Sequence, residues 1–202
     1  MFTGLIREIA TVRSLSNDIL TLQTKHKPKL GDSIAINGVC LSVVDIASDG
    51  FSVELSPETQ KRVATERFQD RVHIEPAMMM GDRFEGHIVQ GHIDAIGKIE
   101  RIDNLGNSYD VVISLDKAHI RHIVPKGSIA IDGVSLTVND VYERSFRLTV
   151  IPITMRETLF HTYKKGTRVN IETDMFARYI EHILTQKNTL SWDEVERISA
   201  LY

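Results

Sequence analysis

The chain has 202 residues, of which 42% are hydrophobic and 25% are charged, as in ordinary globular proteins. This composition excludes a mainly disordered chain, and a single cysteine, Cys40, excludes a disulfide scaffold and favours a reducing compartment. The net charge of −3 argues against a nucleic-acid partner, and no apolar run has the ~20 residues of a membrane span. The first residues show no secretory signal pattern. We therefore expect a cytoplasmic globular protein, but composition indicates no activity.

An internal repeat is the strongest feature of the sequence. Residues 31–46 (GDSIAINGVCLSVVDI) align with 126–141 (KGSIAIDGVSLTVNDV), and nine of the sixteen positions are identical. Further blocks match in the same order, among them RVHIE at 71–75 with RVNIE at 168–172, and GLIREIATV at 4–12 with GHIDAIGKI at 91–99. Each copy is long enough to bury a small core. The repeat predicts two homologous domains, 1–84 and 85–175, followed by a tail at 176–202.

Within the first copy the pattern is that of short strands. Residues 33–37 and 41–46 are rich in β-branched side chains, and the Asn37-Gly38 turn signal separates them. Residues 51–55 alternate, 60–68 fit a short helix or a loop, and 72–74 fit a last strand. The second copy repeats this order with Asp132-Gly133 as the turn. Such a unit fits a small sandwich or a closed barrel, and we favour the barrel because it has no edge strands.

The tail is helical in pattern. Residues 175–187 place Phe176, Ile180, Ile183 and Leu184 on one face, after an N-cap candidate at Asp174. A capping-box pattern at Ser191 begins a second amphipathic segment that extends to Leu201. The helices either close the second barrel or cover a neighbouring subunit, and the pattern alone leaves both alternatives open.

Cys40 and His92 are the residues best suited to chemistry. Cys40 follows a tight turn, and its counterpart in the second copy is Ser135, so a small polar residue stands at both positions but only one is a thiol. A lone cysteine is often only a small buried hydrophobe. His92 has Leu5 as its counterpart and is either a candidate acid or base or a structural residue. His87, His119 and His122 lack the further ligands that a metal site needs.

The combination of motifs resembles the riboflavin synthase family of the α-chain type. The motifs are the opening Met-Phe-Thr-Gly, the paired NGVCLSV and DGVSLTV blocks and the GH-x-x-x-GHID segment, and the resemblance covers essentially the whole chain. It implies an all-β fold of two six-stranded antiparallel Greek-key barrels with a C-terminal helix that forms a homotrimer. The implied reaction transfers a four-carbon unit between two molecules of 6,7-dimethyl-8-ribityllumazine. Its products are riboflavin and 5-amino-6-(D-ribitylamino)uracil, and it uses no metal and no separate cofactor. Association with lumazine synthase is a further expectation.

The resemblance also implies the roles of particular residues. Cys40 matches the family's active-site thiol, acting as nucleophile or as stabiliser of an adduct at ring carbon 7, and His92 is the candidate base or acid. Residues matching the family's substrate-binding positions are Phe2, Gly4, Leu5, Ile6, Ser33, Cys40, Leu41, Ser42, Glu54, Leu55, Ser56, Pro57, Glu58, Thr59, Gly91, His92, Ile93, Lys126, Ser135, Leu136, Thr137, Ile151, Pro152, Ile153, Thr154, Met155, Arg156 and Asp174. In the family, the site forms between the first barrel of one subunit and the second barrel of a neighbour.

The chain departs from the family at a few positions, notably Gln90, where serine is common, and Pro76, where arginine is frequent. Two alternatives remain. Lumazine proteins share the fold and hold a lumazine or flavin as a fluorescent antenna without turnover. A purely structural pair of barrels without a ligand is the other. Retention of Cys40 and His92 favours the enzyme.

Overall fold

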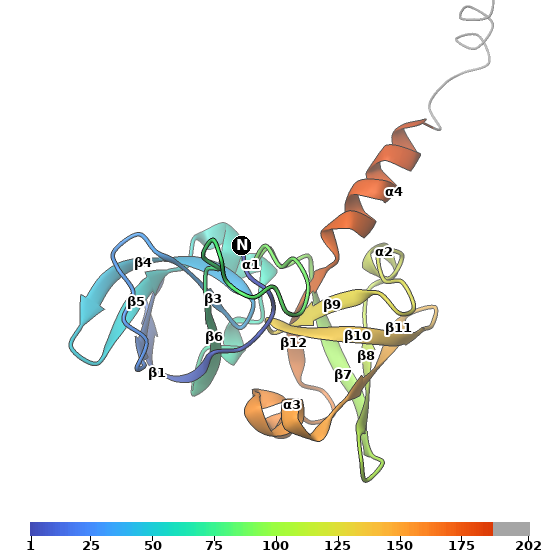
Figure 1. Ribbon diagram of the computed structural model, residues 1–202, viewed down its shortest axis with the longest axis horizontal. Helices are drawn as coiled ribbons and strands as arrows, with labels where there is room; N and C mark the ends of the chain where they lie inside the picture. The colour runs from blue at the N-terminus through green and yellow to red at the C-terminus, as the bar shows by residue number, and fades with distance from the viewer. Residues whose placement is uncertain (188–202) are drawn as a thin grey trace, which may run out of the picture.

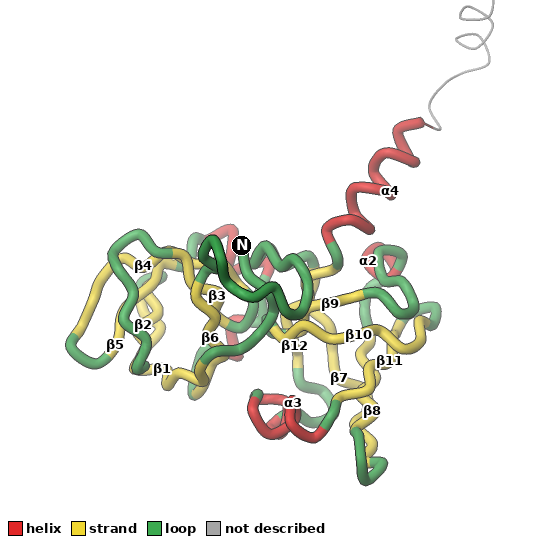
Figure 2. The backbone as a smooth tube through the Cα atoms, viewed as in Figure 1, coloured by secondary structure: helices red, strands yellow, loops and turns green. Residues whose placement is uncertain are grey.

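The computed structural model describes residues 1–187 and shows two closed six-stranded antiparallel barrels (Figures 1 and 2). The predicted fold class is therefore confirmed. The second amphipathic segment predicted from Ser191 lies outside the described residues. No helix within residues 1–187 is long and apolar enough to cross a membrane.

The first barrel has the strand order β1-β2-β5-β4-β3-β6. Its strands are β1 (Glu8–Ser16), β2 (Ile19–Gln23), β3 (Ser33–Ile36), β4 (Val39–Ala47), β5 (Gly50–Glu54) and β6 (Arg71–Pro76). Residues 60–68, for which the sequence fits either a short helix or a loop, contain the end of helix α1 (Pro57–Arg62) and the 3-10 turn η1 (Thr65–Arg67). Leu20, Phe51 and Ile74, all fully buried, belong to its core.

The second barrel repeats this plan. Its strands are β7 (Ala95–Asn104), β8 (Tyr109–Ser114), β9 (Ser128–Ile131), β10 (Val134–Val141), β11 (Ser145–Val150) and β12 (Arg168–Thr173). Short helices α2 (Lys117–Ile120), α3 (Pro152–Glu157) and η2 (Leu159–Thr162) lie between them. The order β10-β11-β8-β7-β12-β9 closes the sheet around a separate apolar core that includes Ile113, Phe146 and Ile171.

Both predicted hairpin turns are present. Asn37 and Gly38 have φ of 46° and 80°, and Asp132 and Gly133 have φ of 44° and 82°, as a type I′ turn requires. The two turns also meet each other. A Cβ atom on Gly38 would lie 2.7 Å from the backbone nitrogen of Gly133, so the barrels approach here more closely than any side chain allows.

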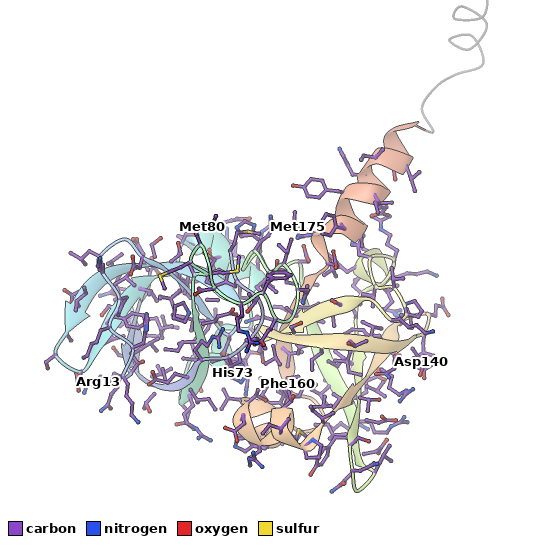
Figure 3. The ribbon with its side chains drawn as sticks, viewed as in Figure 1. Arg13, His73, Met80, Asp140, Phe160 and Met175 are labelled. Carbon is purple, nitrogen blue, oxygen red and sulfur yellow. The ribbon has the colours of Figure 1, made fainter. Side chains whose placement is uncertain are left out.

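A buried polar network joins the barrels beside these turns (Figure 3 labels His73). The His73 ring contacts the Asp132 carbonyl through Nδ1 at 2.9 Å and accepts the Leu159 N–H through Nε2 at 2.7 Å. Asn170 does the same in mirror image, donating to the Asn37 carbonyl at 3.0 Å and accepting the Ala64 N–H at 2.8 Å. Burial lowers the pKa of His73 to about 4, which fits a neutral ring with its hydrogen on Nδ1.

The segment just before β1 and the segment just before β7, here called the leading segments, cross each other. Ile6 precedes the first barrel but packs against the core of the second, whereas Ile93 precedes the second and packs against the core of the first. Where the segments pass each other, Phe2 and Val89 exchange backbone hydrogen bonds of 2.7 and 3.1 Å, and both side chains are buried. Each barrel is therefore completed by residues from the other half of the chain.

Helix α4 (Met175–Lys187) begins and ends where the sequence predicts. Asp174 caps it, accepting the Phe176 N–H at 2.8 Å. The helix projects away from both barrels (Figure 1), and its apolar face stays exposed at 52–58% for Phe176, Ile180, Ile183 and Leu184. Helix α4 therefore does not close the second barrel with this apolar face.

Candidate active site

The crossed segments bring some of the predicted site residues together in two groups. The first group, here the Cys40 face, is built from Cys40, Leu41 and residues 91–93, with Leu55 in the same core as Leu41 and Ile93. Residues 56–59 form the cap and first turn of α1. The centre of the Cys40 face is the contact between Cys40 and Gly91, where the Cys40 N–H donates to the Gly91 carbonyl at 2.9 Å. Gly91 has a φ of +81°, and a Cβ atom there would lie 2.5 Å from the Cys40 Cβ. Only glycine fits this contact. His92 is the next residue along the chain, so its backbone follows directly after the contact with Cys40.

The second group, here the Ser135 face, is built from Ser135, Leu136 and residues 4–6, with Met155 of α3 in the same core as Leu136 and Ile6. Its geometry repeats the first: the Ser135 N–H donates to the Gly4 carbonyl at 2.8 Å. Gly4 has a φ of +79°, and a Cβ atom there would lie 2.6 Å from the Ser135 Cβ. Each face thus combines a barrel from one copy with the leading segment from the other.

Two buried glutamates hold the leading segments in place. Glu172 of β12 accepts the N–H groups of Gln90, Gly91 and His92 at 2.7, 2.8 and 3.1 Å. Glu75 of β6 accepts the Thr3 N–H, the Thr3 hydroxyl and the Gly4 N–H at 2.7, 2.8 and 3.0 Å. Burial raises the pKa of Glu172 to about 7, opposed by the N–H donors of Gln90 and Gly91. Burial likewise raises the pKa of Glu75.

The two faces differ at their centres. On the Ser135 face, the Ser135 hydroxyl lies 2.7 Å from Nδ1 of His87, which is buried. Burial lowers the pKa of His87, and the nearby Asp174 carboxylate opposes this shift. Gly86 lies over the same hydroxyl, because a Cβ atom there would be 3.3 Å from it. Cys40 is half-buried, and the His92 side chain is exposed.

The remaining predicted residues take varied positions. Ser33 and Ser42 face each other across the β3–β4 ladder next to Cys40. Lys126 is exposed at the start of the second copy's hairpin, with a φ of +65°. Phe2 and Leu55 are fully buried: Phe2 lies in a small apolar cluster against which Cys40 packs, and Leu55 lies in the core of the first barrel.

A cavity of about 810 Å³ lies beside the first barrel and includes Thr3, Ser33 and Glu75 in its wall. Cys40 and Ser135 do not line it, and charges of both signs do, from Arg7 and Lys29 to Asp32 and Asp82. We therefore centre the candidate site on the contacts of Cys40 and Ser135 and not on this cavity. Within residues 1–187, no three His, Cys, Asp or Glu side chains cluster as a metal site would require.

Sequence reasoning missed Glu75 and Glu172 as site-building residues, and it weighed His87 only as a metal ligand. The glutamates had a visible signal, because they are the final residues of the matched RVHIE and RVNIE blocks. The contact between His87 and Ser135 had no visible signal in the sequence, because it depends on how the connection between the barrels folds over Ser135.

Two closed barrels with paired glycine contacts define a tandem-barrel protein, and the comparisons specify its family. A family model described as the lumazine binding domain matches residues 3–77 and 90–174. Curated relatives called riboflavin synthase include that of Photobacterium phosphoreum, 37% identical with 98% of each chain covered. That of Actinobacillus pleuropneumoniae is 40% identical, covering 93% of this chain and 91% of its own. This chain therefore belongs to the riboflavin synthase family.

Solved structures agree on the fold. A structure titled LumP complexed with riboflavin superposes with a TM-score of 0.77 at 20% identity, covering 86% of this chain and 100% of that one. A structure of LumP complexed with 6,7-dimethyl-8-(1'-D-ribityl) lumazine gives a TM-score of 0.74 at 20% identity, covering 86% and 99%. At this identity the likeness concerns the arrangement of the two barrels.

Proposed function

We propose that this chain is a riboflavin synthase, a transferase that moves a four-carbon unit between two molecules of 6,7-dimethyl-8-ribityllumazine. The products are riboflavin and 5-amino-6-(D-ribitylamino)uracil. The observation that carries the proposal is the Cys40 face, where a half-buried thiol lies against the segment that bears His92, in a chain of this family. The same face in a binding protein would need neither a thiol nor an imidazole.

The two residues have complementary roles. The lumazine ring is an electron sink that acidifies its own 7-methyl group, so the protein mainly supplies proximity, orientation and proton transfer. Cys40 acts at ring carbon 7, as nucleophile or as stabiliser of the adduct. His92, whose backbone is fixed by Glu172 and whose ring is exposed, acts as base or acid.

The unequal faces match the unequal roles of the two substrate molecules. One molecule gives up four carbons and the other receives them, although both begin identical. We assign one molecule to the Cys40 face and one to the Ser135 face. Phe2 and Ser33 support the former, and Lys126 and Asp174 contribute from the second copy. The Cys40 face presents an open thiol, and the Ser135 face presents a hydroxyl held by His87. This chemical difference lets the two faces treat the donor and the acceptor of the four carbons differently.

The assembly we propose is a homotrimer formed through the tail at 176–202, after domains at 1–84 and 85–175. The exposed apolar face of α4 supports it, because Phe176, Ile180, Ile183 and Leu184 would be covered by neighbouring copies. A Cys40 face would then meet the Ser135 face of a neighbour. The cytoplasm is the compartment that a lone free cysteine favours, and lumazine synthase is the protein partner we propose.

The decisive experiment mixes purified protein with the lumazine and follows absorbance. Flavin absorbance that grows with time, with one pyrimidinedione formed per riboflavin, is expected of the enzyme. A stable blue-green fluorescent complex with no growth of flavin indicates an antenna protein. If neither lumazine nor riboflavin changes the melting temperature, the barrels have a structural role only.

A further inference from the structure

We propose that Arg178 of α4 is a positioning residue for the segment that carries His92, and that its two direct contacts to that segment help to fix the geometry of the Cys40 face. The inference deepens the proposed function and rests on it. It concerns how the site is held and not which group reacts.

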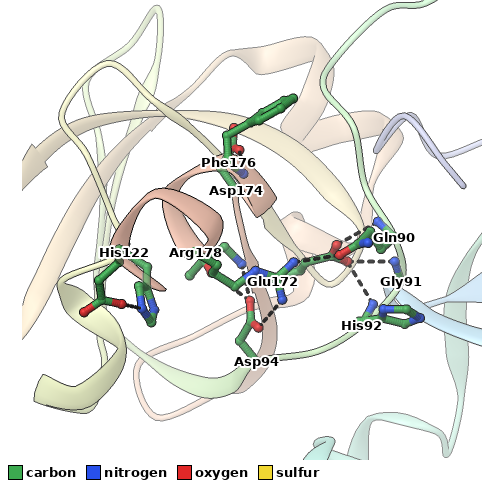
Figure 4. A network of polar contacts seen from close by, with 11 residues as sticks. Gln90, Gly91, His92, Asp94, His122, Glu172, Asp174, Phe176 and Arg178 are labelled. Carbon is green, nitrogen blue, oxygen red and sulfur yellow. Dashed lines mark hydrogen bonds and ion pairs between the residues drawn. The ribbon is translucent and has the colours of Figure 1, made fainter. Parts of the chain in front are cut away.

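The contacts of Arg178 reach the segment at two points (Figure 4). One guanidinium nitrogen donates to Asp94 at 2.5 Å, and the other donates to the Gln90 side-chain oxygen at 2.9 Å. Gln90 and Asp94 lie on either side of Gly91 and His92. One planar guanidinium therefore contacts both ends of the stretch 90–94, here called the turn. Arg178 and Asp94 are 25% and 13% exposed, so solvent only partly screens this pair.

Asp94 and Glu172 connect this clamp to the barrel. The second oxygen of Asp94 accepts the N–H and the hydroxyl of Thr173 at 2.7 and 2.8 Å. Glu172, the neighbour of Thr173 on β12, accepts the three N–H groups of the turn, and Arg178 also favours its charged form. The turn is therefore held from the barrel side by Glu172 and from the helix side by Arg178.

Helix α4 has a second attachment that does not involve this turn. Glu181 pairs with Arg121 at 2.8 Å and with His122, both just after α2 (Figure 4 labels His122). Losing Arg121 would loosen the helix without removing any contact to Gln90, His92 or Asp94. Arg121→Ala is therefore the matched control, because each variant removes one arginine that anchors the same helix.

Gln90 supplies the second acceptor of the clamp. A serine at this position is too short to bring an oxygen to the same point. We therefore expect Gln90→Ser to lose one of the two contacts and to weaken the clamp in part. Arg178→Lys should likewise keep one contact, because an ammonium cannot span both acceptors.

The experiment compares Arg178→Ala, Arg178→Lys and Arg121→Ala in the full chain. We expect Arg178→Ala to lower kcat about tenfold, which corresponds to the loss of one charged hydrogen-bond pair. We expect KM to change by less than about threefold. Arg178→Lys should be intermediate, and Arg121→Ala should stay within about twofold of the parent. Light scattering and melting curves should show the same assembly and similar stability for Arg178→Ala and Arg121→Ala.

Amide hydrogen exchange supplies a readout that does not depend on turnover. The amides of Gly91 and His92 should exchange about tenfold faster in Arg178→Ala, while the Gly4 amide, held by Glu75, should keep its rate. If the parent protein does not convert lumazine, the proposed function fails and the exchange rates still decide the role of Arg178. Equal exchange and equal kcat in the Arg178 and Arg121 variants would overturn the proposal, as would a loss of kcat explained by dissociation.

Discussion

Replacing Gly91 with alanine tests the closest contact in the candidate site. Two separate costs are expected. The first is conformational, since φ at Gly91 is +81° and an L-residue there costs about 1–2 kcal/mol. The second is steric, since the new Cβ would lie 2.5 Å from the Cys40 Cβ and 2.8 Å from its backbone nitrogen. Forcing a methyl group into such a contact costs about 1–3 kcal/mol.

Gly106→Ala separates these costs. Gly106 has a φ of +86°, but nothing lies within 4 Å of its virtual Cβ. It therefore carries the conformational cost alone. For a chain of this size, the extra steric cost should lower the melting temperature of Gly91→Ala by about 2–12 °C beyond that of Gly106→Ala.

The assay is thermal unfolding of the parent and both variants, followed by their rates of flavin formation. We expect Gly106→Ala to keep its activity, and Gly91→Ala to lose most of it because the Gly91 carbonyl and His92 move away from Cys40. If the two variants melt together and turn over equally, the crossed segment is not seated against Cys40 as described, and the account of the site is wrong.

Four further predictions concern other parts of the molecule. Cys40→Ser should reduce turnover severely and leave lumazine binding largely intact, measured by kinetics and fluorescence titration; unchanged turnover would remove the thiol from the mechanism. In urea unfolding, the free energy of unfolding of His73→Asn should stay within about 1 kcal/mol of the parent, because the new side chain has the donor and acceptor that Asn170 uses. His73→Leu leaves the Asp132 carbonyl and the Leu159 N–H without their partner and should cost about 1–3 kcal/mol for each. Equal losses in the two variants would contradict the network. Because burial raises the folded-state pKa of Glu172 from 4.5 to about 7, its contribution to the free energy of unfolding is complete below pH 4.5 and is lost as the pH rises through 7. Glu172→Gln should remove that decline, on the order of 3 kcal/mol, and an identical pH slope in the variant would refute it. Deleting residues 176–202 should give monomers with little activity by light scattering and kinetics, and an active monomer would exclude a site shared between subunits.

The repeat and the turn signals were enough to predict two barrels, their hairpins at Asn37-Gly38 and Asp132-Gly133, and the bounds of α4. Local pattern decides these features, because alternation, glycine in left-handed turns and helical spacing act over a few residues. The apolar face of α4 was also visible, although only the structure shows that the second barrel leaves it exposed.

The crossing of the leading segments could not be predicted. Gly4 and Gly91 belong to matched blocks, so either segment would fit either barrel by its sequence alone. What distinguishes them in the structure is the path of the connection between β6 and β7, which seats Gly91 against Cys40. The same connection brings His87 to Ser135, a contact 48 residues apart along the chain with no periodic signal.

The exchanged leading segments carry a consequence for how such a protein could arise. A single copy of about 90 residues would have no segment of its own over its barrel and could complete a face only by trading segments with a second identical copy, as in a swapped dimer. In that ancestor both faces would be the same by symmetry. Joining two copies in one chain removes this symmetry, because the connection between β6 and β7 then ties the second segment to the first barrel. After such a fusion one face can keep an open thiol while the other acquires a serine held by histidine.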